Sequence, residues 1–142
     1  MLEASDMHRF RFLPIIPGRW VLVASSVSLA LVGLPLSFAT GEVAEWIKAD
    51  SQAAVPALQL WGALLLGAAV TNWMARGLLV GGIYGKAIVM GNLAHWATGA
   101  AVSVKLSVAG VGGGAANGAA IVYVLMAVAF LWLALRDPIE SR

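Results

Sequence analysis

Four apolar stretches, each about 20 residues long and free of internal charge, limit what this chain can fold into more than any other feature. They run from about residue 20 to 39, 56 to 75, 86 to 105 and 118 to 135. An α-helix of that length crosses the apolar core of a bilayer, which is about 30 Å thick. We therefore expect an all-α integral membrane protein in which residues 1–142 form a single transmembrane domain, a four-helix bundle.

The composition agrees with this class and excludes several chemistries. Apolar residues make up 61% of the chain and charged residues 11%, whereas a soluble domain has about 25% charged residues. The sequence contains no cysteine, which excludes disulfide exchange, thiolate catalysis and metal sites built from cysteine. The net charge of +2 comes without any block of lysine or arginine, so the sequence does not indicate a nucleic-acid-binding protein.

The lysines and arginines indicate how the four stretches are oriented, because these residues are enriched in cytoplasmic loops. Lys48 and Lys105 fall on one side of the membrane, and the other basic residues fall on the opposite side: Arg9, Arg11, Arg19, Arg76, Lys86, Arg136 and Arg142. Both termini are therefore predicted to be cytoplasmic, with residues 40–55 and 107–117 outside. An alternative is that the basic start, the first apolar stretch and Ser37-Phe38-Ala39 form a cleavable signal peptide.

Two of the connecting segments have a recognisable pattern. In GEVAEWIKADSQ, residues 41–52, helical spacing places Val43, Trp46 and Ile47 on one face and charged residues on the other. This pattern predicts a short interfacial helix between the first two spans, with a partner-binding surface as the alternative. The glycine-rich segment SVAGVGGGAANG, residues 107–118, lacks the Gly-Lys-Ser/Thr ending of a phosphate-binding loop and is predicted to be a flexible connector.

Small residues recur every three or four positions along each apolar stretch. Helices in a bilayer gain little from packing leucine against leucine, so their contact faces favour small side chains that allow close approach. We therefore predict that these faces pack together in the bundle. They are Ser26, Ala30, Gly33 and Ser37; Gly62, Ala69, Asn72 and Arg76; Asn92, His95, Gly99 and Ser103; and Ala116, Ala120, Tyr123 and Ala127.

Polar side chains interrupt the second and third stretches at similar depths from the predicted cytoplasmic edge. Because polar groups in a bilayer turn away from lipid and toward other helices, we predict a cluster of Asn72, Arg76, Asn92 and His95. Tyr84 and Lys86 are expected at the mouth of this cluster. The cluster is interpreted either as interhelical hydrogen bonding that stabilises the bundle or as a binding site for an anionic headgroup, a quinone or a small polar ligand.

Other functions of small membrane proteins require residues that this sequence lacks. Haem binding through His95 would need a second histidine from another chain, because no other histidine lies within the spans. A proton-coupled exporter ordinarily uses an intramembrane carboxylate, and all acidic residues here lie outside the spans. An intramembrane hydrolase would need a base oriented by a carboxylate beside a serine. No metal site, cofactor or enzymatic activity is therefore predicted.

The stretch LQLWGALLLGAAVTNWMARG, residues 58–77, combines apolar residues, small residues and a closing arginine, and GNLAHWATGAAVSV, residues 91–104, follows it. In this they resemble the small four-span bacterial membrane proteins grouped as DoxX-like. The resemblance implies a small helical bundle in a bacterial inner membrane, and it assigns no functional residue.

The sequence as a whole predicts a multi-pass membrane protein that acts in interaction, assembly or small-ligand binding within the bilayer. Its expected partners are the lipids, other membrane protein chains or further copies of itself. The alternative is a small oligomeric transporter or channel-like protein. These functions differ in whether water reaches the predicted polar cluster. A transporter requires a water-accessible path to the cluster, whereas an assembly module buries it.

Overall fold

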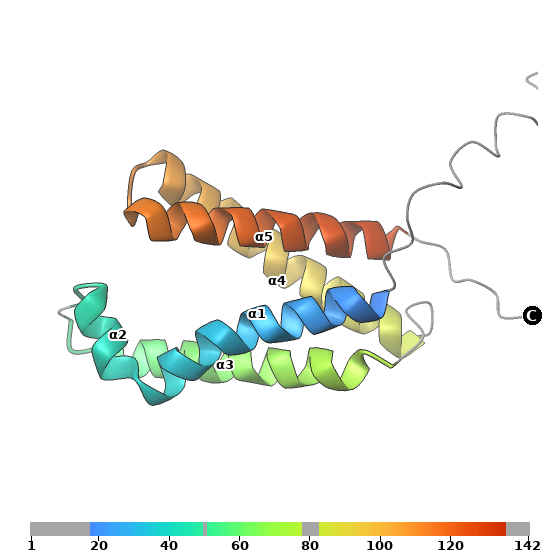
Figure 1. Ribbon diagram of the computed structural model, residues 1–142, viewed down its shortest axis with the longest axis horizontal. Coiled ribbons are helices and arrows are strands. Elements are labelled where there is room, and N and C mark those ends of the chain that lie inside the picture. Colours follow the sequence, from blue (N-terminus) through green and yellow to red (C-terminus); the bar gives the residue numbers. More distant parts are fainter. Residues whose placement is uncertain (1–17, 50, 78–82, 136–142) are drawn as a thin grey trace, which may run out of the picture.

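The computed structural model describes residues 18–49, 51–77 and 83–135, and this part of the chain is all-helical (Figure 1). Its helices are α1 (Gly18–Phe38), α2 (Thr40–Trp46), α3 (Ala54–Ala75), α4 (Ile83–Val108) and α5 (Gly113–Ala134). Four of them, α1, α3, α4 and α5, are long and apolar enough to cross a membrane. The prediction of an all-α chain with four spans of this kind is confirmed.

The long helices are arranged as two closely packed pairs. The helix α1 packs along α3, and α4 packs along α5, whereas contacts between the pairs are sparse. Figure 1 shows that the helices in each pair run in opposite directions. The starts of α1 and α4 therefore lie at the same end of the molecule as the ends of α3 and α5, and α2 lies at the opposite end.

Small residues bring α1 and α3 into close contact. A Cβ atom added to Gly62 would lie 2.8 Å from the Ser37 backbone nitrogen and 2.9 Å from the Leu36 carbonyl carbon. A Cβ atom on Gly33 would lie 3.1 Å from the Gly62 carbonyl oxygen. Farther along the pair, the Ser26 hydroxyl donates a 2.7 Å hydrogen bond to the Ala69 carbonyl oxygen. The small-residue faces predicted for these two helices therefore meet each other.

The pair of α4 and α5 is built around an aromatic ring. A Cβ atom on Gly99 would lie 2.0 Å from Cε1 of Tyr123, so the Tyr123 ring packs directly on the glycine backbone. The same ring lies 5.0 Å, between centroids, from the buried indole of Trp96. Phe130 and Val89 are also buried in the core. Glycine at position 99 therefore provides the space that an aromatic side chain of α5 fills.

The turn between α4 and α5 is shorter than the predicted connector. Gly110 and Gly112 have φ angles of 70° and 84°, a left-handed conformation that glycine adopts without steric cost. The helix α5 begins at Gly113, so residues 113–117 belong to the helix and not to the connector. The Ser107 hydroxyl donates a 2.6 Å hydrogen bond to Oδ1 of Asn117 across this turn. The helix α5 thus begins within a sequence of low helix propensity.

The short helix α2 follows α1 almost directly. Its Thr40 and Ala44 are buried, and Val43 packs against the core. Trp46 and Ile47, which the sequence placed on the same apolar face as Val43, are exposed. A short helix therefore lies between the first two long helices, as predicted, and part of its apolar face is left uncovered by the described residues.

Candidate functional site

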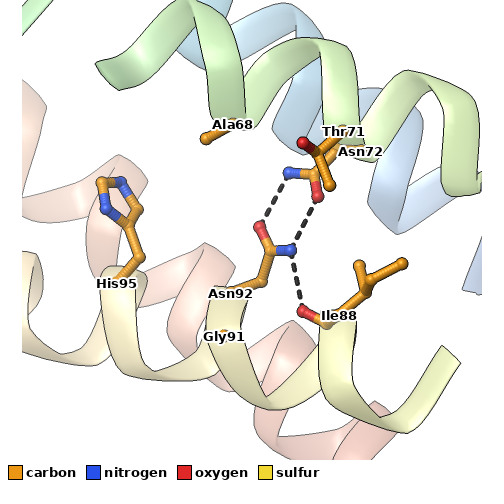
Figure 2. Close-up of a pocket in the computed structure, with 7 residues that line it drawn as sticks. All are labelled: Ala68, Thr71, Asn72, Ile88, Gly91, Asn92 and His95. Carbon is orange, nitrogen blue, oxygen red and sulfur yellow. Dashed lines mark hydrogen bonds between the residues drawn. The ribbon is translucent and has the colours of Figure 1, made fainter. Parts of the chain in front are cut away.

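Two asparagines form the centre of a polar network between α3 and α4. Nδ2 of Asn72 donates to Oδ1 of Asn92, and Nδ2 of Asn92 donates to Oδ1 of Asn72, both at 2.7 Å (Figure 2). The second N–H of Asn92 donates to the Ile88 carbonyl oxygen at 2.9 Å. The paired amides are a direct polar link between the two helix pairs, whose other contacts are sparse.

Ser25 and Trp96 complete this network from α1 and α4. The Ser25 hydroxyl oxygen accepts hydrogen bonds from Nδ2 of Asn72 at 2.9 Å and from Nε1 of Trp96 at 3.0 Å. It also lies 3.4 Å from Oδ1 of Asn92, to which it donates. All four N–H groups of the two asparagine amides are thereby used. We refer to Ser25, Asn72, Asn92 and Trp96 as the polar clasp.

Sequence reasoning found two of the four members of the polar clasp. Ser25 was not assigned to a contact face, and Trp96 was not assigned a partner. One signal was present for Trp96, since it lies four residues after Asn92 and shares its helical face. An indole N–H buried in an apolar environment requires an acceptor, which a hydroxyl on a neighbouring helix can provide.

His95 lies next to the polar clasp but does not belong to it. Its imidazole extends from α4 toward α3, on the same side of α4 as Asn92 (Figure 2). The ring makes an edge contact with Trp96, at 5.2 Å between centroids, and lies 5.9 Å from the Tyr123 ring. Its Nε2 atom is buried, and no hydrogen-bond partner is found for it among the described residues. The imidazole is therefore held by ring packing while one of its polar atoms is left unsatisfied.

The imidazole of His95 borders two cavities. The first has a volume of about 280 Å³ and lies beside the polar clasp, between α3 and α4; its lining residues are Ala68, Thr71, Asn72, Ile88, Gly91, Asn92 and His95. The second has a volume of about 530 Å³ and is bordered by α3, α4 and α5. Trp61, Val102 and Tyr123 are among its mostly apolar lining residues, and Thr98 and Ser103 add hydroxyl groups. His95 thus stands between two spaces along the sparsely packed α3–α4 contact.

Arg76 lies apart from the other three residues of the predicted cluster. Its guanidinium carbon lies 4.1 Å from the centroid of the Trp73 ring, and its Nη1 donates a hydrogen bond to the Trp73 carbonyl oxygen. Arg76 lines a third cavity, together with Arg19, at the end of α3. The physical reason is that a long arginine side chain near a helix end extends toward the polar end of the helix and not toward its middle.

The two residues expected at the mouth of the cluster are at the start of α4. Tyr84 is 81% exposed and Lys86 is also exposed. Neither is among the lining residues of the cavities beside His95. The structure thus brings together Asn72, Asn92 and His95, and it leaves Arg76, Tyr84 and Lys86 outside this group.

The chemistry available at His95 is hydrogen bonding within an apolar space. In the described ranges, no group of three or more histidine, aspartate or glutamate residues is placed to hold a metal ion. The described acidic residues, Glu42 and Glu45, both lie in α2. The polar groups of the residues that line the two cavities are therefore amides, hydroxyls, one indole N–H and one imidazole, which suit a neutral ligand with one polar group.

Comparisons of the chain with protein-family models, with curated proteins and with solved structures give no match. The resemblance to DoxX-like proteins stays a prediction.

Proposed function

We propose that the protein is a multi-pass membrane protein that binds a neutral, lipid-soluble molecule beside His95, in the space between α3, α4 and α5. The ligand would carry a carbonyl or hydroxyl group on an apolar body, and quinones belong to this class. The polar clasp would stabilise the site, because it joins the helices that border it.

The observation that supports this proposal most directly is the unsatisfied Nε2 atom of His95. A buried polar atom without a partner costs about 1–3 kcal/mol, and a hydrogen bond to a ligand removes that cost. The imidazole lines both neighbouring cavities, so a ligand in either one would lie next to the ring, and a turn about the bond between Cβ and Cγ on binding would bring Nε2 to it. The larger cavity, at about 530 Å³, is open to the surface of the protein, where its lining residues Trp61 and Val102 are 46% and 54% exposed, and its apolar lining suits a lipid-soluble ligand that enters from the bilayer.

A neutral ligand fits these groups better than an anion does. Arg76, which the sequence placed beside His95, lines a different cavity with Arg19. The two amides that remain near His95 use all their N–H groups within the polar clasp. An anion at His95 would therefore lack both a neighbouring cation and free amide donors.

The burial of the polar clasp supports ligand binding over the alternative of a transporter or channel. A water-filled path along α3 would have to reach Asn72, whose exposed fraction is 1%. Ser25, which contacts Asn72 from α1, is 0% exposed. Of the four residues of the polar clasp, only Asn92 is partly exposed. A network buried to this extent suits a structural role, and the ligand site lies beside it.

In the proposed orientation, both termini lie on the cytoplasmic side of a membrane, and the four long helices form one bundle. In this orientation Arg19 and Arg76 lie at the cytoplasmic end and Lys105 at the outer end, as the enrichment of cytoplasmic loops in basic residues requires. The exposed Trp46, which ends α2, and Ile47, its C-cap, would then contact the outer membrane surface. The resemblance stated above favours a bacterial inner membrane.

The ligand proposal predicts that a cavity-filling substitution and the loss of the imidazole both weaken binding. Val102 lines the larger cavity, so Val102→Trp should occupy the space that the ligand needs. His95→Phe keeps an aromatic ring but removes both nitrogens. With a short-chain benzoquinone and a long-chain alcohol as probes, native mass spectrometry of the full chain in mild detergent should show binding at least about tenfold weaker for both variants, the equivalent of one hydrogen bond or more.

The matched control is Val104→Trp, which adds the same indole two residues away on α4. Val104 is 41% exposed and is not a lining residue of the larger cavity, so this variant should bind the probes as the unmodified protein does. Equal binding by His95→Phe and the unmodified protein would contradict the proposal. Stronger retention of dodecanoate than of the long-chain alcohol would also contradict it, because that result would indicate an anion site.

The proposed orientation can be tested by cysteine labelling, because the sequence contains no cysteine of its own. Ser51→Cys, in the segment before α3, should react with a membrane-impermeant maleimide added to intact cells. Gly77→Cys, directly after α3, should react only after the membrane is permeabilised. Both positions are exposed, so accessibility within the protein does not limit either reaction. The opposite labelling pattern would reverse the orientation.

A further inference from the structure

Two arginines lie together where α1 begins and α3 ends. Arg19 is the second residue of α1, and Arg76 is the C-cap of α3. Both line a cavity of about 440 Å³ with Trp73, Met74 and Gly77. Because α1 and α3 are closely packed along their length, the separation of these two residues is set by the helix pair itself.

Each guanidinium lies against an indole ring. The guanidinium carbon of Arg19 is 5.3 Å from the centroid of the Trp20 ring, and that of Arg76 is 4.1 Å from the Trp73 centroid. A guanidinium that contacts a ring by its face keeps N–H groups at its edge for other acceptors. Arg76 uses one of its five N–H groups on the Trp73 carbonyl oxygen, and the others can bind a ligand.

The positive charge of this cavity is not balanced by the described part of the chain. The described carboxylates, Glu42 and Glu45, are in α2, which lies at the opposite end of the molecule (Figure 1). The helix ends contribute little, because the positive end of the α1 dipole lies beside the negative end of the α3 dipole. Among the described residues, the two arginines are therefore the charged groups that set the electrostatic character of the cavity.

We propose that this cavity binds the phosphate group of an anionic phospholipid. Guanidinium groups bind phosphate oxygens through paired, charge-assisted hydrogen bonds, and basic pockets between membrane helices recognise acidic lipid headgroups in this way. The site is separate from the one proposed at His95, since the two share no lining residue. It therefore does not depend on the function proposed above.

The surroundings of the two arginines favour a lipid over free phosphate. Trp20, Trp73 and Met74 are 54%, 46% and 72% exposed, so apolar surface lies directly beside the charged groups. Acyl chains can cover this surface while the headgroup binds the guanidinium groups. Free phosphate has the same anionic oxygens but gains nothing from the apolar surface.

The test is a native mass spectrometry titration of the full chain in mild detergent with phosphatidylglycerol, phosphatidylcholine and inorganic phosphate. The double variant Arg19→Gln/Arg76→Gln should bind phosphatidylglycerol at least about tenfold more weakly than the unmodified protein. Arg76→Lys, which keeps the charge but loses the planar fork, should give an intermediate loss. Phosphatidylcholine, which has no net charge, should bind weakly to every variant.

The matched control is Lys86→Gln/Lys105→Gln, which removes the same charge from exposed positions outside the cavity. It should change phosphatidylglycerol binding by less than about twofold, as expected for exposed charges that make no specific contact. Equal losses in the two double variants would overturn the proposal, because charge alone would then explain binding. Unchanged binding in the arginine variant would also overturn it. Inorganic phosphate that binds as tightly as phosphatidylglycerol would overturn the lipid assignment.

Discussion

Alanine at position 62 is expected to lower the free energy of unfolding by about 1–3 kcal/mol, the usual cost of inserting atoms into a packed contact. The added Cβ would lie 2.6 Å from the Ser37 hydroxyl oxygen and 2.8 Å from the Ser37 backbone nitrogen. A side chain can turn away from such a contact, but backbone atoms of α1 can move only with their helix. The substitution should therefore separate α1 from α3, and unfolding of the protein in mixed detergent micelles measures the loss.

The same helix provides the control for this prediction. A Cβ atom at Gly67 meets no heavy atom within 4 Å other than the adjoining backbone of its own helix, so Gly67→Ala introduces no clash. Alanine also favours the helical conformation over glycine by up to about 1 kcal/mol. Gly67→Ala should therefore be neutral or stabilising. If both variants were equally stable, the close crossing of α1 and α3 at Gly62 would not contribute to the fold.

Leucine at position 72 is expected to lower the free energy of unfolding by about 1–3 kcal/mol, because the remaining members of the polar clasp keep their polar groups and lose their partner. Asn72 supplies hydrogen bonds to both Ser25 and Asn92, and its side chain is buried. Leucine has a similar volume, so loss of hydrogen bonds and not loss of packing would cause most of the change. Unfolding in mixed micelles with an increasing fraction of denaturing detergent measures the effect.

A double-mutant cycle separates the amide pair from its surroundings. Asn72→Leu/Asn92→Leu should cost less than the sum of the two single substitutions, with a coupling energy of about 0.5–3 kcal/mol, as is typical of contacting residues. Asn117→Leu is the control, because Asn117 is exposed and accepts a hydrogen bond only from Ser107 among the described residues; its cost should stay within about 0.5 kcal/mol. Additive costs for Asn72 and Asn92 would contradict a direct stabilising pair.

The sequence was sufficient to predict the helical class and the four long apolar helices, because length and lack of charge identify a membrane span without knowledge of its neighbours. It also placed Gly33 and Gly62 on contact faces, since small residues at helical spacing indicate where helices approach. The sequence did not predict which of these faces contact each other. The structure shows that Gly62 contacts α1 and Gly99 contacts α5, a pairing that no periodicity within one helix can specify.

The candidate site was only partly predictable, for reasons that differ between residues. Asn72 and Asn92 could be expected to meet, because an amide side chain in an apolar helix costs free energy unless another polar group forms hydrogen bonds with it. Arg76 shares a helical face with Asn72, but its long side chain reaches the Trp73 ring near the end of α3. Ser25 could not be identified, since a serine in a membrane helix satisfies its hydroxyl on its own backbone as readily as on another helix.

The separation of the long helices into two pairs has a consequence for the order in which the protein assembles during synthesis. The contact between Ser26 and Ala69 needs only the first part of the chain, whereas the bond between Ser25 and Asn92 joins residues 67 positions apart. The helices α1 and α3 can therefore pack together at Gly33 and Gly62 while Asn72 still lacks its partner on α4. In a bilayer, that amide would have one partner fewer until α4 is inserted, so the pairing of Asn72 with Asn92 would favour association of the second helix pair with the first.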